Sequence, residues 1–361
     1  MRRLSLLLAA LLWAGAQGVE SPAYMRLAEL SQLGLEAELA ATGLPLVTGK
    51  GELAADGQAA ALVARALFAV GREEEAFQLL DQTQPSDAAG KVALTLMRAR
   101  LLLERDRLKE ALALLIEKPN AVKPRFPGVP ENLVLLGRAF VRSDRHDLAE
   151  PVLDAFVRAA PLHPEGPAAW HMLFDCALKR GDVARAEICR GEQERLLRWH
   201  ELLKTRRLQV RRSPEAREPR LGLVLLWMDA GELDEAQRAL DGLLQHHPSD
   251  VDAWLYQGEV HRKEGRPEDA ARDYARALEL GPGDQRARFS LALLHAAAGR
   301  AEEARRELET VLATDAADDP RFLSAHLELA RLLTAAGEAD AARARYDLYV
   351  AHGGKEPLKL R

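Results

Sequence analysis

The stretch from Ala253 to Pro282 decides the fold. It reads AWLYQGEVHRKEGRPEDAARDYARALELGP. With Val251 as position 1, the informative residues are Trp254 at 4, Gly258 at 8, Gly265 at 15, Ala270 at 20, Tyr274 at 24, Ala277 at 27 and Pro282 at 32. Small residues at positions 8 and 20 let two antiparallel helices approach closely, while a glycine ends the first helix and a proline stops the second. The stretch therefore predicts a helix-turn-helix unit.

The same pattern returns at a spacing of 34 residues in the neighbouring copies. Copies begin at Arg217 and Gln285, and a later one begins near Leu323 after an Asp-rich insertion. Weaker copies begin near 167, 130, 92 and 57, marked by Gly181, Gly137, Asp106 with Ala111, and Gly71 with Ala76. Eight units at a similar period predict a stack of helical hairpins that share one continuous core.

These residues resemble the motif of the tetratricopeptide repeat family over about four fifths of the chain. The resemblance implies an all-α, right-handed superhelical solenoid of stacked helix-turn-helix repeats. The composition agrees, because 48% hydrophobic residues, mostly Ala and Leu, with 29% charged and 5% aromatic residues favour helix. The resemblance implies the fold firmly and the function only loosely.

The first sixteen residues have the layout of a secretory signal peptide. Arg2 and Arg3 precede an apolar run from Leu4 to Trp13, and Ala14 and Ala16 supply small residues for cleavage after Ala16. A helical run of about ten residues spans about 15 Å, half of a bilayer core of about 30 Å, which favours a cleaved leader over an anchor. The sequence therefore predicts a periplasmic or secreted protein.

The remaining chain divides into five parts. We expect a capping helix (Ser21 to Ala41) and a loop (Gly43 to Gly51) in 17–56, four repeats in 57–200, a basic helix or linker in 201–216, four repeats in 217–356 and a tail in 357–361. The chain from Gly353 is expected to fray. The spacing between the fourth and fifth repeats is about 50 residues, so the helix that starts near Asp182 is expected to continue to about Arg212.

Basic residues are concentrated between Lys204 and Arg220. The segment holds seven of them, Lys204, Arg206, Arg207, Arg211, Arg212, Arg217 and Arg220, against Glu215 and Glu218. Two interpretations remain open: a contact for anionic lipid or an acidic partner, or a solvated helix face. Removing Arg2 and Arg3 changes the formal net charge from -5 to -7, so the overall charge gives no indication of nucleic-acid binding.

The residues that carry enzyme or metal chemistry do not form a recognisable motif. His200 to Lys204 begins like a zinc peptidase motif, but Lys204 stands where the second histidine is needed. Gly43 to Gly51 lacks the spacing of a phosphate-binding loop, and His261 and His295, both at position 11, are expected to pack in a column. We therefore predict no enzyme activity, no cofactor and no metal site.

The two cysteines, Cys176 and Cys189, fall on the two helices of the fourth repeat at similar distances from the turn at Gly181. A disulfide across the hairpin suits an exported protein and would contribute about 3 kcal/mol on loop-entropy grounds. Two small buried thiols fit the spacing equally well.

In tetratricopeptide superhelices, positions 2, 5, 9, 12 and 13 of the first helices line an inner groove. At these positions the first block carries the basic residues Arg65, Arg100, Arg138, Arg142 and Lys179, with Phe68, Leu96 and Val134 beside them. Guanidinium groups between apolar side chains suit an acidic peptide or a C-terminal carboxylate.

The second block carries an apolar strip at the same positions. Its members are Leu221, Leu225, Met228, Leu255, Phe289, Leu293 and Leu327. An amphipathic helix or an extended hydrophobic segment suits such a strip. For both blocks the alternative is ordinary solvated surface and packing between repeats.

Taken together, these features predict a non-catalytic scaffold or adaptor of the bacterial cell envelope that binds a peptide or helix of a protein partner in its groove. The alternative is a structural component of an envelope assembly that uses its outer face and the basic helix, with peripheral membrane contact through Lys204 to Arg220. The bacterial setting is inferred from the Arg and Ala bias together with the signal peptide.

Overall fold

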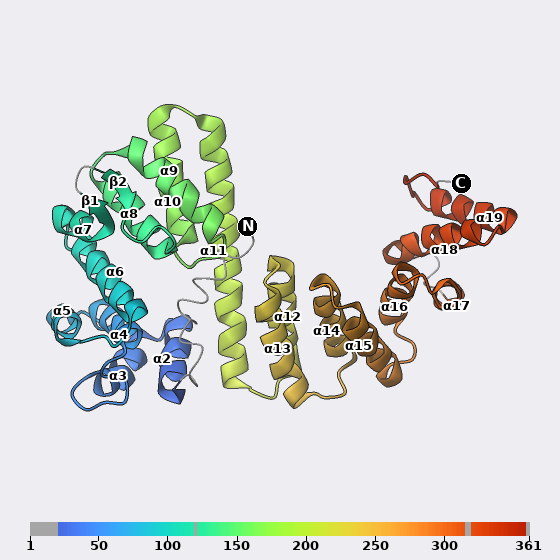
Figure 1. The fold of residues 1–361 in the computed structure, drawn as a ribbon, viewed down its shortest axis with the longest axis horizontal. Coiled ribbons are helices and arrows are strands. Elements are labelled where there is room, and N and C mark those ends of the chain that lie inside the picture. Colours follow the sequence, from blue (N-terminus) through green and yellow to red (C-terminus); the bar gives the residue numbers. More distant parts are fainter. Residues whose placement is uncertain (1–20, 119–120, 315–318, 359–361) are drawn as a thin grey trace. The chain divides into compact units, whose positions relative to one another are not determined.

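The computed structural model describes residues 21–118, 121–314 and 319–358, so the predicted signal peptide lies outside it. Within these residues the chain forms eighteen α-helices, which follow one another as nine hairpins (Figure 1). The helices are α2 (Pro22–Gln32), α3 (Glu36–Val47), α4 (Gly57–Ala69), α5 (Glu73–Gln82), α6 (Ala88–Glu104), α7 (Leu108–Leu115), α8 (Pro130–Arg142), α9 (His146–Ala159), α10 (Gly166–Arg180), α11 (Val183–Arg212), α12 (Arg217–Ala230), α13 (Leu233–His246), α14 (Val251–Lys263), α15 (Pro267–Leu280), α16 (Gln285–Ala297), α17 (Ala301–Leu312), α18 (Leu323–Ala335) and α19 (Ala339–Ala351). A 3-10 turn, η2 (Pro320–Phe322), precedes α18. The predicted all-α repeat solenoid is confirmed.

The small residues of the motif lie where the helices meet. A Cβ atom on Gly137 would stand 2.4 Å from Leu153 Cδ2, and one on Gly258 would stand 2.5 Å from Tyr274 Cε1. Both glycines occupy position 8 of their repeats. The first helix of each of these hairpins therefore approaches the second more closely than any side chain would allow.

Position 15 ends the first helix of each of the eight predicted repeats in the left-handed backbone region. Six of these residues are glycines: Gly71, Gly181, Gly231, Gly265, Gly299 and Gly337. The other two are Asp106 and Asp144, with φ of 59° and 56°. Aspartate tolerates this conformation better than most residues. Both carboxylates also pair with a basic side chain of the following repeat: Asp106 with Arg142 at 3.1 Å, and Asp144 with Lys179 at 3.5 Å.

The left-handed turn at Asp144 predicts that glycine is more stable than alanine at this position, and that the order is the opposite within a helix. Asp144→Ala should unfold more easily than Asp144→Gly by roughly 1 kcal/mol, because alanine pays the full left-handed cost and glycine does not. The order should reverse at the exposed Asp347 within α19, where glycine is the worse helix former by about 1 kcal/mol. Urea unfolding of the four variants measures both differences. An Asp144→Gly variant no more stable than Asp144→Ala contradicts the prediction.

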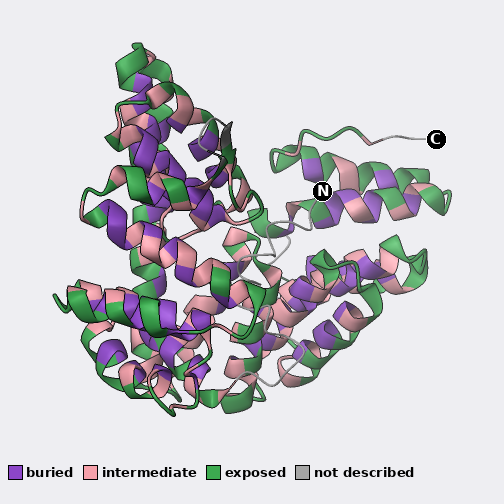
Figure 2. Cartoon of the chain, turned by 60° about the vertical axis from the view of Figure 1, so that its left-hand side comes forward, coloured by how far each residue is buried: buried purple, intermediate pink, exposed green. Residues whose placement is uncertain are grey.

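The chain divides into two compact units, one up to Thr205 and one from Arg206. Unit 1 contains the hairpins α2/α3 to α8/α9 and the hairpin of α10 with the first part of α11; unit 2 contains the four hairpins from α12 to α19. The thirty residues of α11 account for the long spacing between the fourth and fifth repeats. Figure 2 shows buried and exposed residues alternating along the helices, as expected for helices that pack on one side. No described helix is both long enough and apolar enough to cross a membrane.

The N-terminal segment differs from the single capping helix and loop that we expected. It forms a full hairpin, α2 and α3, that turns through Gly34 at a φ of 68°. The predicted loop from Gly43 is wrong up to Val47, because Gly43 is buried within α3, where a Cβ atom would meet Val63 Cγ2 at 2.4 Å. Glycine serves there as a contact between helices and not as a turn.

A short β-hairpin interrupts the helices of unit 1. Helix α7 ends at Leu115, and β1 (Ile116–Lys118) pairs antiparallel with β2 (Ala121–Pro124). The Arg125 backbone N–H closes the hairpin by donating to the Leu115 carbonyl at 2.8 Å. The chain therefore leaves the α7 axis at Leu115, and the next helix, α8, begins at Pro130.

Candidate protein-binding surfaces

Two of the predicted groove arginines hold one internal carboxylate. Glu165, the residue before α10, accepts from Arg100 Nη1 at 2.6 Å through Oε1 and from Arg138 Nη2 at 2.5 Å through Oε2. All three side chains are only 19–20% exposed. Each carboxylate oxygen thus has its own guanidinium partner, and the two arginines come from two different repeats.

The electrostatics of this cluster follow from that geometry. Burial by itself would raise the pKa of Glu165, but the charges and hydrogen bonds of Arg100 and Arg138 outweigh it and lower the pKa to about 2. Glu165 is therefore a carboxylate at all physiological pH values. The acidic ligand that the sequence predicted for these arginines is present, but it belongs to the chain itself.

The other predicted basic residues of unit 1 are also engaged within the chain. Arg65 donates to Ser31 Oγ at 2.9 Å and pairs with Glu36 at 3.0 Å. Arg142 donates to the Leu103 carbonyl as well as to Asp106. The apolar neighbours are no more accessible, because Leu96 and Val134 are 6% and 0% exposed and Phe68 packs against the core. In unit 1 the predicted groove arginines are therefore already paired within the chain, and the apolar residues beside them are buried or half-buried.

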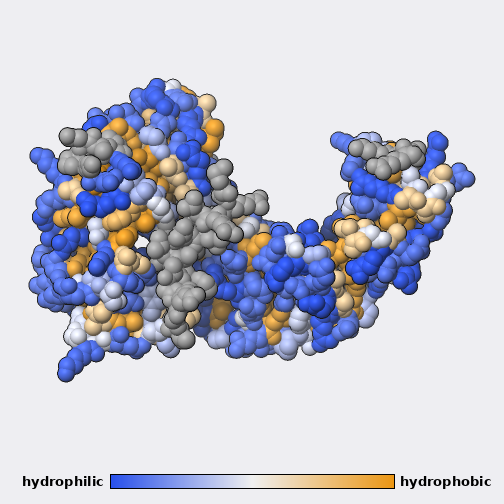
Figure 3. Space-filling view, viewed as in Figure 1, coloured by the Kyte–Doolittle hydropathy of each residue, from blue (hydrophilic) through white to orange (hydrophobic). Residues whose placement is uncertain are grey.

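In unit 2 the predicted apolar strip is only partly accessible. Leu255 and Leu327 are buried in the core, and Phe289 meets Phe322 edge to face at 5.8 Å between ring centroids. What remains at the surface is Leu225, which is 37% exposed, with the half-buried Leu221 and Met228 on α12 and Leu293 on α16. We call the three residues of α12 the α12 strip. Figure 3 shows hydrophobic areas interspersed with hydrophilic ones on the face that it draws.

Comparison with known proteins agrees with the repeat geometry. Two family models, both described as tetratricopeptide repeat, match the chain, one at residues 134–193 and 221–285 and the other at 261–325. The chain is a tetratricopeptide repeat protein. Such repeats generally mediate contacts between proteins and are generally not catalytic, so the protein is an interaction scaffold.

The solved structures to which the chain is similar include the following three. A crystal structure of MamA has 17% identity and a TM-score of 0.37, over 50% of this chain and 94% of that one. Pseudomonas aeruginosa pilF has 20% identity and a TM-score of 0.38, over 53% and 78%. The Cut9–Hcn1 tetramer of the APC/C has 14% identity and a TM-score of 0.36, over 95% and 81%. No curated protein matches the sequence. With TM-scores this low, no partner or activity transfers to this tetratricopeptide array.

Several residues of the basic segment Lys204 to Arg220 stabilise the start of unit 2. Arg207 lies 5.6 Å above the Trp227 ring, and its burial lowers the pKa of the guanidinium group. Arg217 pairs with Asp250 and Asp252, and Arg220 Nε donates to the Pro214 carbonyl. Arg207, Arg217 and Arg220 therefore contribute to the packing of unit 2.

The two cysteines of this repeat protein are free thiols, and both are buried. Cys176 Sγ lies 3.5 Å from His146 Nδ1. Burial raises the pKa of Cys176 to about 11 and also raises the pKa of Cys189, so neither thiol is an activated nucleophile. Of the two alternatives that the spacing left open, the structure has the buried thiols.

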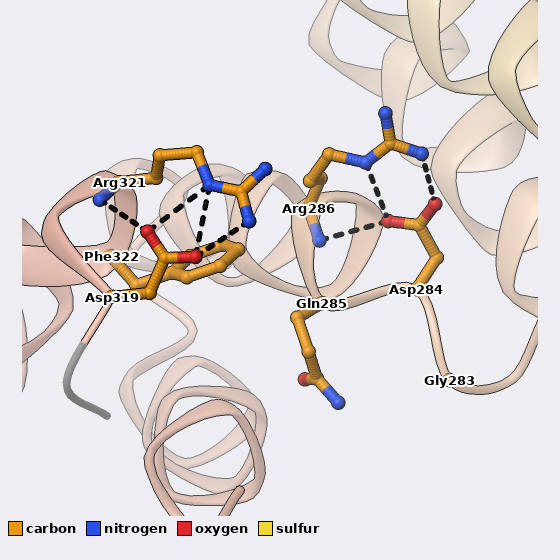
Figure 4. A pocket seen from close by; sticks show the side chains of 7 residues that line it. All are labelled: Gly283, Asp284, Gln285, Arg286, Asp319, Arg321 and Phe322. Atoms are coloured by element: carbon orange, nitrogen blue, oxygen red, sulfur yellow. Dashed lines mark hydrogen bonds and ion pairs between the residues drawn. The ribbon is translucent and has the colours of Figure 1, made fainter. Parts of the chain in front are cut away.

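The remaining polar sites are self-contained. His261 Nδ1 lies 2.5 Å from Asp273 Oδ2, and in the described residues no group of three or more metal-ligating side chains comes together. A pocket of about 380 Å³ is lined by Gly283, Asp284, Gln285, Arg286, Asp319, Arg321 and Phe322. In Figure 4 each arginine of this pocket faces an aspartate two residues before it. Both guanidinium charges are therefore compensated within the pocket.

Proposed function

We propose that this protein is an exported, non-catalytic adaptor of the bacterial cell envelope that binds an apolar helix or extended segment of a partner protein through the α12 strip and Leu293. The observation that carries the proposal is the contrast at position 9. In unit 1 three of the four residues at this position are arginines that pair with carboxylates of the chain, whereas two of the four in unit 2 are leucines, Leu225 and Leu293, and Leu225 is 37% exposed.

The leucines at position 9 of unit 2 are suited to an apolar ligand because Leu225 is exposed and Leu293 is only half-buried. Leu225 lies between the half-buried Leu221 and Met228, which are one helical turn before and after it. Burying such side chains against a partner contributes about 25 cal/mol per Å² of apolar surface. Asp229, which follows Met228 on α12, is exposed and supplies a charge beside the strip. Export is supported by the leader-like residues before Gln17.

The proposal is tested by site-specific crosslinking in envelope extract. The double variant Leu225→Asp/Leu293→Asp should lose the crosslinked partner of the wild-type chain by at least tenfold, because burying a carboxylate among apolar groups is unfavourable. Leu202→Asp is the matched control, since Leu202 is 44% exposed but lies on α11. Circular dichroism verifies that all variants fold. Equal capture by the double variant and the control contradicts the proposed surface, and a mature N-terminus other than Gln17 contradicts the proposed cleavage.

A further inference from the structure

The chain beyond α19 does not fray as its sequence suggested. Residues 353–358 are described, and Figure 1 shows the segment turning back from the end of α19. Its central residue, Glu356, is held at three points of the last hairpin. Its carboxylate pairs with Arg331 of α18, its N–H donates to Tyr349 Oη at 3.2 Å, and its carbonyl accepts from Tyr346 Oη at 3.3 Å.

Two glycines make this return possible. Gly353 has a φ of 93°, which side-chain-bearing residues rarely adopt. A Cβ atom on Gly354 would stand 2.3 Å from Tyr349 Cζ, so only glycine fits against that ring. Gly353 and Gly354 therefore allow the extended segment that contains Glu356 to lie against Tyr346 and Tyr349.

The location of this contact in the repeat is informative. Arg331 occupies position 9, and at the same position of the sixth repeat Glu259 accepts from Ser290 Oγ of the next hairpin at 3.1 Å. At the sixth repeat, position 9 thus contacts the hairpin that follows, whereas Arg65 at position 9 of the first repeat pairs with Glu36 of the hairpin before it. In the last described repeat the position-9 residue, Arg331, pairs with the tail through Glu356.

We propose that Arg331, Tyr346 and Tyr349 form a recognition site for an acidic residue in an extended peptide segment, which the tail fills with Glu356. The site contacts the backbone N–H, the backbone carbonyl and the carboxylate of one residue, so it selects both an extended backbone and an acidic side chain. It is separate from the α12 strip and does not depend on the function proposed for that strip.

The tail is held loosely enough to be exchanged. The side chains of Arg331 and Glu356 are 41% and 59% exposed, and water screens an ion pair of that exposure. Its occupancy depends on the short connection to α19, which gives the tail an effective concentration on the order of millimolar. An acidic segment of a partner that makes further contacts with unit 2 therefore competes with the tail for the site.

The test uses a fluorescently labelled peptide with the sequence of residues 352–361, HGGKEPLKLR. In the full chain, Gly354→Val should expel the tail because the new side chain meets the Tyr349 ring. Gly128→Val is the matched control, since nothing lies within 4 Å of a Cβ atom at Gly128. By fluorescence anisotropy, Gly354→Val should bind the peptide at least tenfold more tightly than the wild type or Gly128→Val. A chain ending at His352 should bind it equally well.

Two further measurements show whether the peptide binds at this site. Adding Arg331→Met to the Gly354→Val chain should weaken peptide binding roughly two- to fivefold, as is usual for an exposed ion pair, and a peptide with alanine in place of glutamate should bind correspondingly weakly to Gly354→Val. Equal binding of the peptide to wild type and Gly354→Val, or equal binding of the glutamate and alanine peptides, overturns the proposal. Loss of partner crosslinking in the Leu225→Asp/Leu293→Asp chain does not affect either result.

Discussion

Replacing Glu165 by glutamine should lower the free energy of unfolding by about 3 kcal/mol at pH 7. The pKa of this carboxyl group falls from an ordinary 4.5 to about 2 in the folded chain, and each pKa unit corresponds to about 1.4 kcal/mol. The neutral amide also leaves Arg100 and Arg138 close together with much less compensation for their charges. Urea unfolding of the full chain, followed by circular dichroism, measures the loss.

The same carboxylate predicts how this difference depends on pH. Because the folded pKa of Glu165 is lower than the unfolded one, its stabilisation is complete above pH 4.5 and disappears as the pH falls through about 2. The advantage of wild type over Glu165→Gln should thus be constant between pH 7 and 6. Roughly a quarter should be lost at pH 4 and over half at pH 3. An advantage that grows on acidification contradicts the assignment.

An exposed glutamate serves as the control for Glu165. Glu110 pairs with Arg107 one turn away on the surface, and its side chain is 56% exposed. Glu110→Gln should change the free energy of unfolding by less than about 0.5 kcal/mol, as is usual for exposed ion pairs. If Glu165→Gln is as mild as Glu110→Gln, the buried cluster does not stabilise unit 1 in the way we infer.

The repeat motif was predictable because each of its positions has a local physical role. Glycine at 8 permits close helix contact, and glycine or aspartate at 15 provides a left-handed turn, whatever lies elsewhere in the chain. Asp106 could be assigned to the turn from its spacing alone, and its φ of 59° agrees. These roles repeat with the period, so the sequence carries eight copies of the same information.

The binding residues were less predictable because their environment is not local. The position of Arg100 and Arg138 in the motif indicated that they point inward, but Glu165 is 65 and 27 residues away from them. Nothing in the spacing shows that the connection before α10 brings a carboxylate between the two arginines. A basic stripe in a repeat protein therefore indicates a surface, and the charges of the connecting segments decide whether it is free.

The structures of the first hairpin and of the tail after α19 were not predicted from the motif. The pair α2/α3 has the geometry of a hairpin, but its sequence lacks the motif residues that mark the other repeats, so a search for the motif passes over it. The tail is held by backbone groups of Glu356, which any sequence provides. Its only sequence signals are Gly353 and Gly354, and two glycines near a chain end read equally well as a flexible terminus.

The N-termini of α4 and α6 should tolerate no side chain at their point of contact. A Cβ atom on Gly57 would stand 2.6 Å from both the Cα and the carbonyl oxygen of Gly90. These are backbone atoms of a helix whose first turn is fixed by the Asp87 cap, so they cannot rotate away as the end of a side chain can. Gly57→Ala must push the two helices apart and should lower the free energy of unfolding by about 3 kcal/mol, the upper range for overpacking.

A second glycine in unit 1, Gly191, should respond in the opposite way when it is replaced by alanine. Gly191 lies within α11, with nothing within 4 Å of a Cβ atom and no positive φ. Gly191→Ala should therefore raise the free energy of unfolding by about 0.5–1 kcal/mol, because alanine is the better helix former. Comparing the two alanine variants by urea unfolding separates steric contact from helix propensity, since propensity alone favours alanine within both helices. If Gly57→Ala is also stabilising, α4 and α6 do not meet through bare backbone, and the spacing of the first two repeats must differ from that seen here.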